Sequence, residues 1–157
     1  ILIERVENLL DFDPRSGAKR FEFWESNIAS KLGLGQAVRI AQEEELRRIA
    51  ATIQELAGDL YQKLCLINGV RLHHPPECGI VTFWLENVDS AVVKDRLWER
   101  SADGTRVEVS VVPATSTPLD SAQSGVPDMI RASLSYTNSA ADILLLCSRL
   151  SSINKLF

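Results

Sequence analysis

The segment that decides the fold of this chain reads Ile130-Arg131-Ala132-Ser133-Leu134-Ser135-Tyr136-Thr137-Asn138-Ser139-Ala140-Ala141-Asp142. Its first half, residues 130–135, alternates apolar and polar side chains, which is the period of a half-buried strand. Ser139 stands three residues before Asp142, a spacing that resembles a capping box with aspartate in place of the usual glutamate. We therefore predict a strand that turns tightly into a capped helix.

One charged residue, Arg131, stands in this predicted strand. A guanidinium group there can bind a carboxylate, because its fork of N–H donors matches two carboxylate oxygens. A solvated surface charge explains the same residue without any ligand. On this segment alone the solvated charge is the simpler interpretation.

The composition is that of a soluble globular domain. The chain has 157 residues, of which 45% are hydrophobic and 24% are charged, enough for one domain with a substantial core. Its formal net charge of −4 argues against a nucleic-acid surface, which usually carries a basic excess. No apolar run is long enough to span a membrane, and no signal peptide is recognisable. We expect neither a nucleic acid nor a membrane among its partners.

The cysteines and histidines favour neither a disulfide framework nor a metal site. Cys65, Cys78 and Cys147 are an odd number without close spacing, so we expect a reducing, cytoplasmic location. A zinc site would have to combine His73, His74 and Cys78 with an acidic residue. Two prolines follow the histidines directly, which favours a solvated loop, and we predict no metal site.

The order of predicted elements indicates an α+β fold. These elements are a helix over 1–10, a loop over 11–20, a helix from Ile28, a long helix over 46–64 ended by Asn68-Gly69, strands over 70–72 and 79–86, a helix to Arg100 capped by Asp89 or Ser90, a strand over 105–112, a long loop over 113–128, the Arg131 strand, and a helix from about Ala140. This order predicts a small, mostly antiparallel sheet of three to four strands with helices on one face, preceded by the long helix.

Four stretches carry a more specific signal when they are taken together and in order. They are residues 21–29 with Gly33-Leu34-Gly35, the long helix with Asn68-Gly69-Val70-Arg71-Leu72, Gly79-Ile80-Val81-Thr82-Phe83 with the helix after Asp89, and the segment from Ile130 to Asp142. Together they resemble the C-terminal small domain of class V, fold-type I enzymes that depend on pyridoxal 5′-phosphate. That group includes cysteine desulfurases, selenocysteine lyases, and related epimerase-like and aminotransferase proteins.

The resemblance implies a role for Arg131 and a larger parent protein. In this family the arginine of the final strand binds the substrate α-carboxylate, and Arg131 matches that position. The parent would be a homodimer that acts on a small α-amino acid, held so that its Cα bond lies correctly over the cofactor ring. The chain begins without methionine inside a helical apolar stripe, which is typical of a fragment. Residues 1–20 would then be the remnant of the connection from a missing large domain, and residues 21–157 the small domain.

Two positions depart from the family pattern. Desulfurases of this family carry a nucleophilic cysteine in the loop before the final strand, and residues 113–128 contain none, which disfavours cysteine-based sulfur transfer. The family often places a Gly-Thr pair before the Asn27 position, where it reaches the cofactor phosphate of the neighbouring subunit. Trp24 and Glu25 stand there in this chain, and a glutamate repels phosphate. That contact is either lost or taken over by Ser26, so Ser26 and Asn27 are the candidate cofactor-binding residues.

The family's cofactor lysine has no counterpart in the sequence. The lysines are Lys19, Lys31, Lys63, Lys94 and Lys155, and none stands in a Ser-x-His-Lys-like setting. We therefore expect no catalytic residue in this chain, no pyridoxal phosphate bound by the chain alone, and no activity of its own. A second hypothesis is a non-catalytic binding or assembly module derived from this fold, in which Arg131 is structural. The first helix and residues 21–24 would then form a partner surface.

Overall fold

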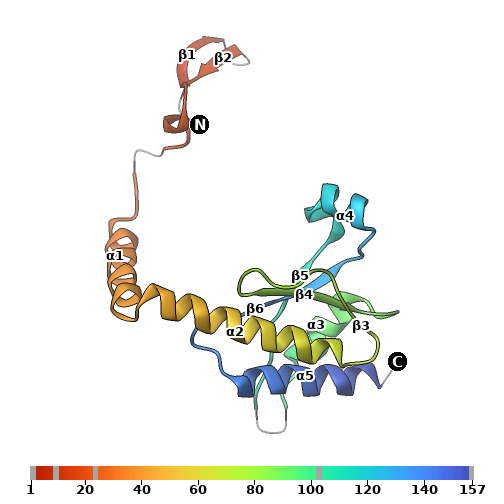
Figure 1. The fold of residues 1–157 in the computed structure, drawn as a ribbon. Helices are drawn as coiled ribbons and strands as arrows, with labels where there is room; N and C mark the ends of the chain where they lie inside the picture. The colour runs from red at the N-terminus through yellow and green to blue at the C-terminus, as the bar shows by residue number, and fades with distance from the viewer. Residues whose placement is uncertain (1–2, 9–10, 23–24, 102–103, 156–157) are drawn as a thin grey trace. The chain divides into compact units, whose positions relative to one another are not determined.

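The computed structural model describes residues 3–8, 11–22, 25–101 and 104–155, and it divides the chain into two compact units, residues 1–43 and 44–157 (Figure 1). Among the described residues, none of the helices combines the length and apolar composition that a membrane crossing requires. The predicted division into a connecting segment, residues 1–20, and a small domain, residues 21–157, stays a prediction.

The first unit contains a β-hairpin and a helix. Strand β1 (Ile3–Asn8) pairs antiparallel with β2 (Asp11–Pro14), and a 3-10 turn over Ala18–Phe21 precedes helix α1 (Ile28–Glu43). The predicted helix over 1–10 and the loop over 11–20 are therefore wrong. Short apolar runs fit helical and strand periods alike, and here the pairing of two neighbouring segments decides the outcome. Helix α1 was predicted correctly.

The second unit is built on an antiparallel sheet in the order β3-β4-β6-β5. Its strands are β3 (Val70–Leu72), β4 (Ile80–Leu85), β5 (Ser110–Val112) and β6 (Met129–Ser133). Strand β6 lies between β4 and β5, and its Arg131 faces Thr82 on one side and Ser110 on the other. The strand that carries Arg131 is thus an inner strand of the sheet.

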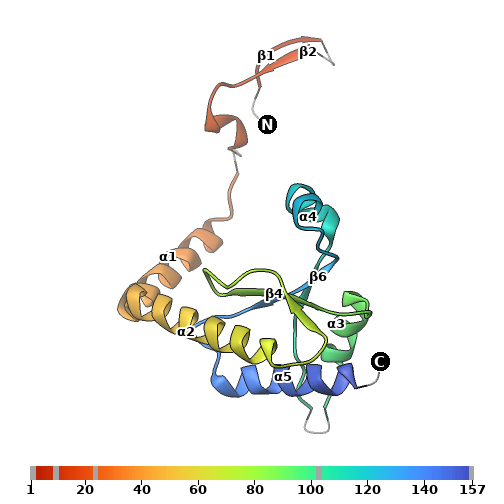
Figure 2. The same cartoon turned by 45° about the vertical axis from the view of Figure 1, so that its right-hand side comes forward.

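One face of this sheet is covered by helices α2 (Leu46–Cys65), α3 (Ser90–Trp98) and α5 (Ala140–Asn154), as Figure 2 shows. The core between the sheet and these helices is fully apolar at its centre. Its largest side chains with essentially no exposed surface are Phe83, Leu60, Leu64, Leu85, Leu97, Ile130, Ile143 and Leu150. Burying each such side chain contributes about 1.5–3 kcal/mol. The predicted α+β fold with helices on one face is confirmed.

The structure differs from the predictions at two boundaries and in the role of Gly69. The strand predicted over 105–112 is short, because the N–H of Val107 donates to Leu97 O at 3.1 Å instead of joining the sheet. Helix α2 ends at Cys65, within one residue of the predicted end, but Gly69, with a φ of 75°, does not end the helix directly and instead turns the chain into β3. The helix after Asp89 ends at Trp98, and of the two proposed caps it is the Asp89 side chain that accepts from the N–H of Ala91, at 2.7 Å.

The segment 113–128 is not an irregular loop. It contains a 3-10 turn over Ala114–Ser116 and a short helix, α4 (Pro118–Ser124). Pro118 occupies the first turn, where its missing N–H costs nothing, and Gly125 ends the helix in the left-handed region with a φ of 65°. The prediction of a continuous loop was wrong because Ser, Thr, Pro and Gly are also the residues that start and stop a short helix.

Gly79 lies at the start of β4, where α2 and the end of β6 also meet. A Cβ atom there would lie 2.6 Å from Leu134 O and 2.7 Å from Ile53 Cγ2. We expect Gly79→Ala to lower the free energy of unfolding by about 1–3 kcal/mol, because backbone as well as a side chain must move. Urea denaturation followed by circular dichroism measures this change.

The matched control for Gly79→Ala is Gly58→Ala, in the interior of α2, where a Cβ atom would meet nothing within 4 Å. Alanine is the better helix former, so this variant should gain about 0.5–1 kcal/mol. Equal effects of the two substitutions would show that the close approach at Gly79 does not constrain the fold.

Candidate functional site

Arg131 lies on the face of the sheet that the core helices do not cover. Along β6, Ile130 and Ala132 are buried while Arg131 and Ser133 are exposed. Successive side chains of a strand point to opposite faces, so Arg131 and Ser133 share the face away from the core. The inner position of β6 fixes the backbone of Arg131 between two neighbouring strands.

Arg131 borders a shallow depression of about 320 Å³. The depression is lined by Glu108, Val109, Ser110, Arg131 and Ser133. Within the described part of the chain, the Arg131 side chain has no hydrogen bond or ion pair. An unpaired guanidinium flanked by serine hydroxyls suits a small carboxylate, since all of these groups can donate hydrogen bonds. Glu108 is the one acidic group of this lining, and its negative charge opposes the binding of any anion, a carboxylate included.

The turn from β6 into α5 holds the Arg131 strand in place and follows the predicted pattern. The N–H of Ser135 donates to Asn138 Oδ1 at 2.8 Å, and the N–H of Ser139 donates to Asp142 Oδ2 at 2.8 Å. The hydrogen bond from the Ser139 backbone, and then that from the Asn138 side chain, lower the pKa of Asp142. The charged carboxylate is therefore the capping form, and its contribution to stability is lost as the pH falls through this lowered pKa.

Ser26 and Asn27 lie in the other compact unit, directly before α1. The N–H of Ser30 donates to Asn27 Oδ1 at 3.0 Å, so Asn27 caps the helix, and Ser26 is exposed. Trp24 lies outside the described residues, whereas Glu25 is described and exposed. The contact of Ser26 and Asn27 with a phosphate stays a prediction.

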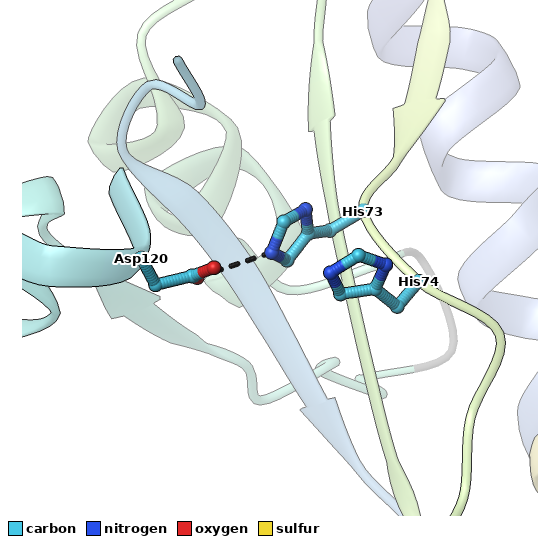
Figure 3. A group of neighbouring side chains, drawn as sticks. All are labelled: His73, His74 and Asp120. Carbon is cyan, nitrogen blue, oxygen red and sulfur yellow. Dashed lines mark hydrogen bonds and ion pairs between the residues drawn. The ribbon is translucent and has the colours of Figure 1, made fainter. Parts of the chain in front are cut away.

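A second group of functional side chains gathers where sequence reasoning had assigned a solvated loop. His73 Nε2 and Asp120 Oδ2 are joined by a 3.1 Å hydrogen bond, and the His73 and His74 rings lie with their centroids 3.8 Å apart (Figure 3). Among the described residues, the group that could hold a metal ion consists of these three side chains and does not include Cys78. Asp120 was missed because it lies 47 positions from His73, on the unpredicted helix α4.

The depression at Arg131 lacks groups that a pyridoxal-phosphate site needs, and binding of the cofactor by this chain alone stays untested. Such a site needs a lysine for the Schiff base, a group against the ring and donors around the phosphate. The depression at Arg131 is lined by no lysine and no aromatic side chain of the described chain. Lys63 is engaged elsewhere, since it pairs with Asp59 on the same helix. We therefore assign no reaction step to this chain.

Comparison with known proteins gives one family and one fold. The sequence profile of the family described as aminotransferase class-V matches residues 12–146. No curated protein sequence is significantly similar to the chain.

Solved structures share the fold. The cysteine desulfurase from Thermococcus onnurineus NA1 has 21% identity and a TM-score of 0.74 over 99% of this chain and 38% of that one. The cysteine desulfurase CsdA from Escherichia coli has 20% identity and a TM-score of 0.74 over 99% of this chain and 37% of that one. The cystine C-S lyase C-DES, solved with its product cysteine persulfide, has 22% identity and a TM-score of 0.66 over 87% of this chain and 32% of that one. Another C-DES structure has glycine covalently linked to its pyridoxal-phosphate cofactor. The chain thus spans somewhat more than a third of the desulfurases that it matches.

Proposed function

This chain belongs to the class-V aminotransferase family, and from that membership we propose that it is the small domain of a two-domain enzyme that depends on pyridoxal phosphate and acts on an α-amino acid. The share of the desulfurase chains that it covers, 38% and 37%, supports a missing large domain as its partner. The family resemblance found in the sequence is confirmed by the family match and by the shared fold.

The observation that carries the proposal is the setting of Arg131. The Arg131 guanidinium has no partner among the described side chains. Arg131 lies on an inner strand of the sheet, and two serines, Ser110 and Ser133, line the same depression. A bidentate pair with the α-carboxylate would fix the amino acid in one orientation, which is the part of the chemistry that a small domain can supply. The cofactor, bound by the complete enzyme, would supply the electron sink.

The remaining parts of the proposal concern assembly and location. We place the segment before α1 at the cofactor phosphate of the neighbouring subunit in a homodimer, with Ser26 supplying a hydroxyl beside the first N–H groups of the helix. Helix N-termini favour anions, which supports this placement. Cys65, Cys78 and Cys147 are free thiols, which supports a reducing, cytoplasmic location.

The alternative, an assembly module without catalysis, is favoured by one specific feature. Helix α1 buries none of its described residues, although it carries Ile28, Leu32 and Leu34. An exposed apolar helix face of this kind can bind a separate partner protein as well as a large domain of the same enzyme. Sedimentation of the purified chain tests this alternative, since a well-behaved monomer argues against an assembly role.

The proposal predicts that the isolated chain does not retain pyridoxal phosphate. The chain is incubated with equimolar cofactor, reduced with borohydride and analysed by mass spectrometry. We expect no more adduct on the folded chain than on the same chain unfolded in urea. The unfolded chain controls for random reaction of the exposed lysines. A stoichiometric adduct at one lysine of the folded chain alone would contradict the proposal.

A further inference from the structure

The histidine pair after β3 is held in a defined position. The backbone N–H of His73 donates to Thr82 O at 3.3 Å, which extends the pairing of β3 with β4 by one residue. The chain bends at His74, and this bend brings the two imidazole rings together. Pro75 restricts the backbone of His74, and Pro76 stiffens the segment further. The backbone of both histidines is thus held in place before any ligand arrives.

Asp120 approaches this pair from helix α4. Its Oδ2 atom contacts His73, while Oδ1 accepts a hydrogen bond from the Ser124 hydroxyl at 3.2 Å. The Ser124 contact directs one carboxylate oxygen toward the histidines, as outer hydrogen bonds do for metal ligands. The His73 side chain is 11% exposed and that of Asp120 is 45% exposed, so the group is anchored on one side and open to solvent on the other.

We propose that His73, His74 and Asp120 form a binding site for a divalent transition-metal ion, with zinc as the preferred ion and water as its fourth ligand. Two imidazoles and one carboxylate are a ligand set of zinc sites, whereas calcium and magnesium prefer oxygen ligands. The ion would tie the end of β3 to α4, and this proposal is independent of the function of Arg131.

The distances fit this assignment. Ligand atoms about 2.0–2.1 Å from a tetrahedral zinc ion are about 3.3 Å from one another. His73 Nε2 and Asp120 Oδ2 are 3.1 Å apart, close to that separation. One nitrogen of His74 lies within 4.8 Å of the ligand atoms of both other residues. A modest rotation of the His74 ring therefore completes the set.

The competing explanation is a hydrogen bond between His73 and Asp120 that ties α4 to β3 without any ion. His74 distinguishes the two explanations, because the hydrogen bond does not use it and the metal site does. Cys78 serves as the control for incidental binding, since it is an exposed thiol near the histidines in sequence but outside the group.

The test is calorimetric titration of the chelator-treated 157-residue chain with Zn²⁺, checked by native mass spectrometry. We expect one ion per chain and, at one hundred times the Kd, an increase in Tm of about 5–10 °C. His74→Ala and Asp120→Asn should each weaken binding by at least about 100-fold, and Cys78→Ser should leave it unchanged. His74→Ala should also melt like the metal-free wild type, which shows that its fold is intact.

Three results would overturn the proposed metal site. They are the absence of stoichiometric Zn²⁺ binding, binding that survives both His74→Ala and Asp120→Asn, and binding that depends on Cys78.

Discussion

Arg131→Ala should weaken binding of the amino-acid substrate to the proposed two-domain enzyme by about 100-fold or more. Each hydrogen bond between charged groups contributes about 1.5–3 kcal/mol, and a tenfold change in affinity corresponds to about 1.4 kcal/mol. Losing a bidentate pair therefore removes at least two powers of ten. The Arg131 side chain has no partner among the described residues, so its loss should leave the Tm of the protein unchanged. Steady-state kinetics and a melting curve measure the two effects.

Two further variants sharpen the test of Arg131. Arg131→Lys keeps the positive charge but loses the planar fork, so its affinity for substrate should fall between the wild type and alanine. Arg96→Ala removes an exposed arginine on α3, which is not among the residues lining the depression, and should leave the kinetics unchanged. Unaltered KM and kcat in Arg131→Ala would exclude the proposed role of Arg131.

Phe83→Ala should cost about 3–5 kcal/mol of the free energy of unfolding. Phe83 is 0% exposed and lies on β4, between β3 and β6, where the helices cover the sheet. A domain is stable by only about 5–15 kcal/mol, so this loss removes a large part of the total. Urea denaturation of the 157-residue chain, followed by far-ultraviolet circular dichroism, gives the value.

Ile80→Ala is the matched control for Phe83→Ala on the same strand. Ile80 is 42% exposed, so its truncation should cost about 1 kcal/mol or less. Comparable losses for the two variants would mean that the core does not lie on the helix-covered face of the sheet.

The parts of the fold that the sequence predicted well are those in which local signals agree with burial. In α2, the positions of Leu60 and Leu64 follow the helical period and are also fully buried. The β6–α5 turn was predicted because its hydrogen bonds, such as that from Ser139 to Asp142, join residues three positions apart. In both places, interactions between residues close in sequence are enough to determine the local structure.

The parts that sequence reasoning missed depend on contacts between distant segments. The hairpin of β1 and β2 is decided by pairing, whereas the apolar spacing of residues 1–10 also fits a helix. Val107 leaves the predicted strand because Leu97, on a different element, offers the acceptor. Asp120 meets His73 only because α4 returns toward the end of β3. No local pattern around any of these residues encodes its partner.

The central claim is that Arg131 binds the substrate α-carboxylate, and a binding cycle tests it most directly. Wild type and Arg131→Ala, both as the cofactor-loaded two-domain enzyme, are titrated with the amino acid and with the amine that lacks only its carboxylate. We expect the substitution to weaken binding of the amino acid by about 100-fold and binding of the amine not at all, since the lost pair needs both charges. An equal loss for both ligands, or no loss for either, would contradict the claim.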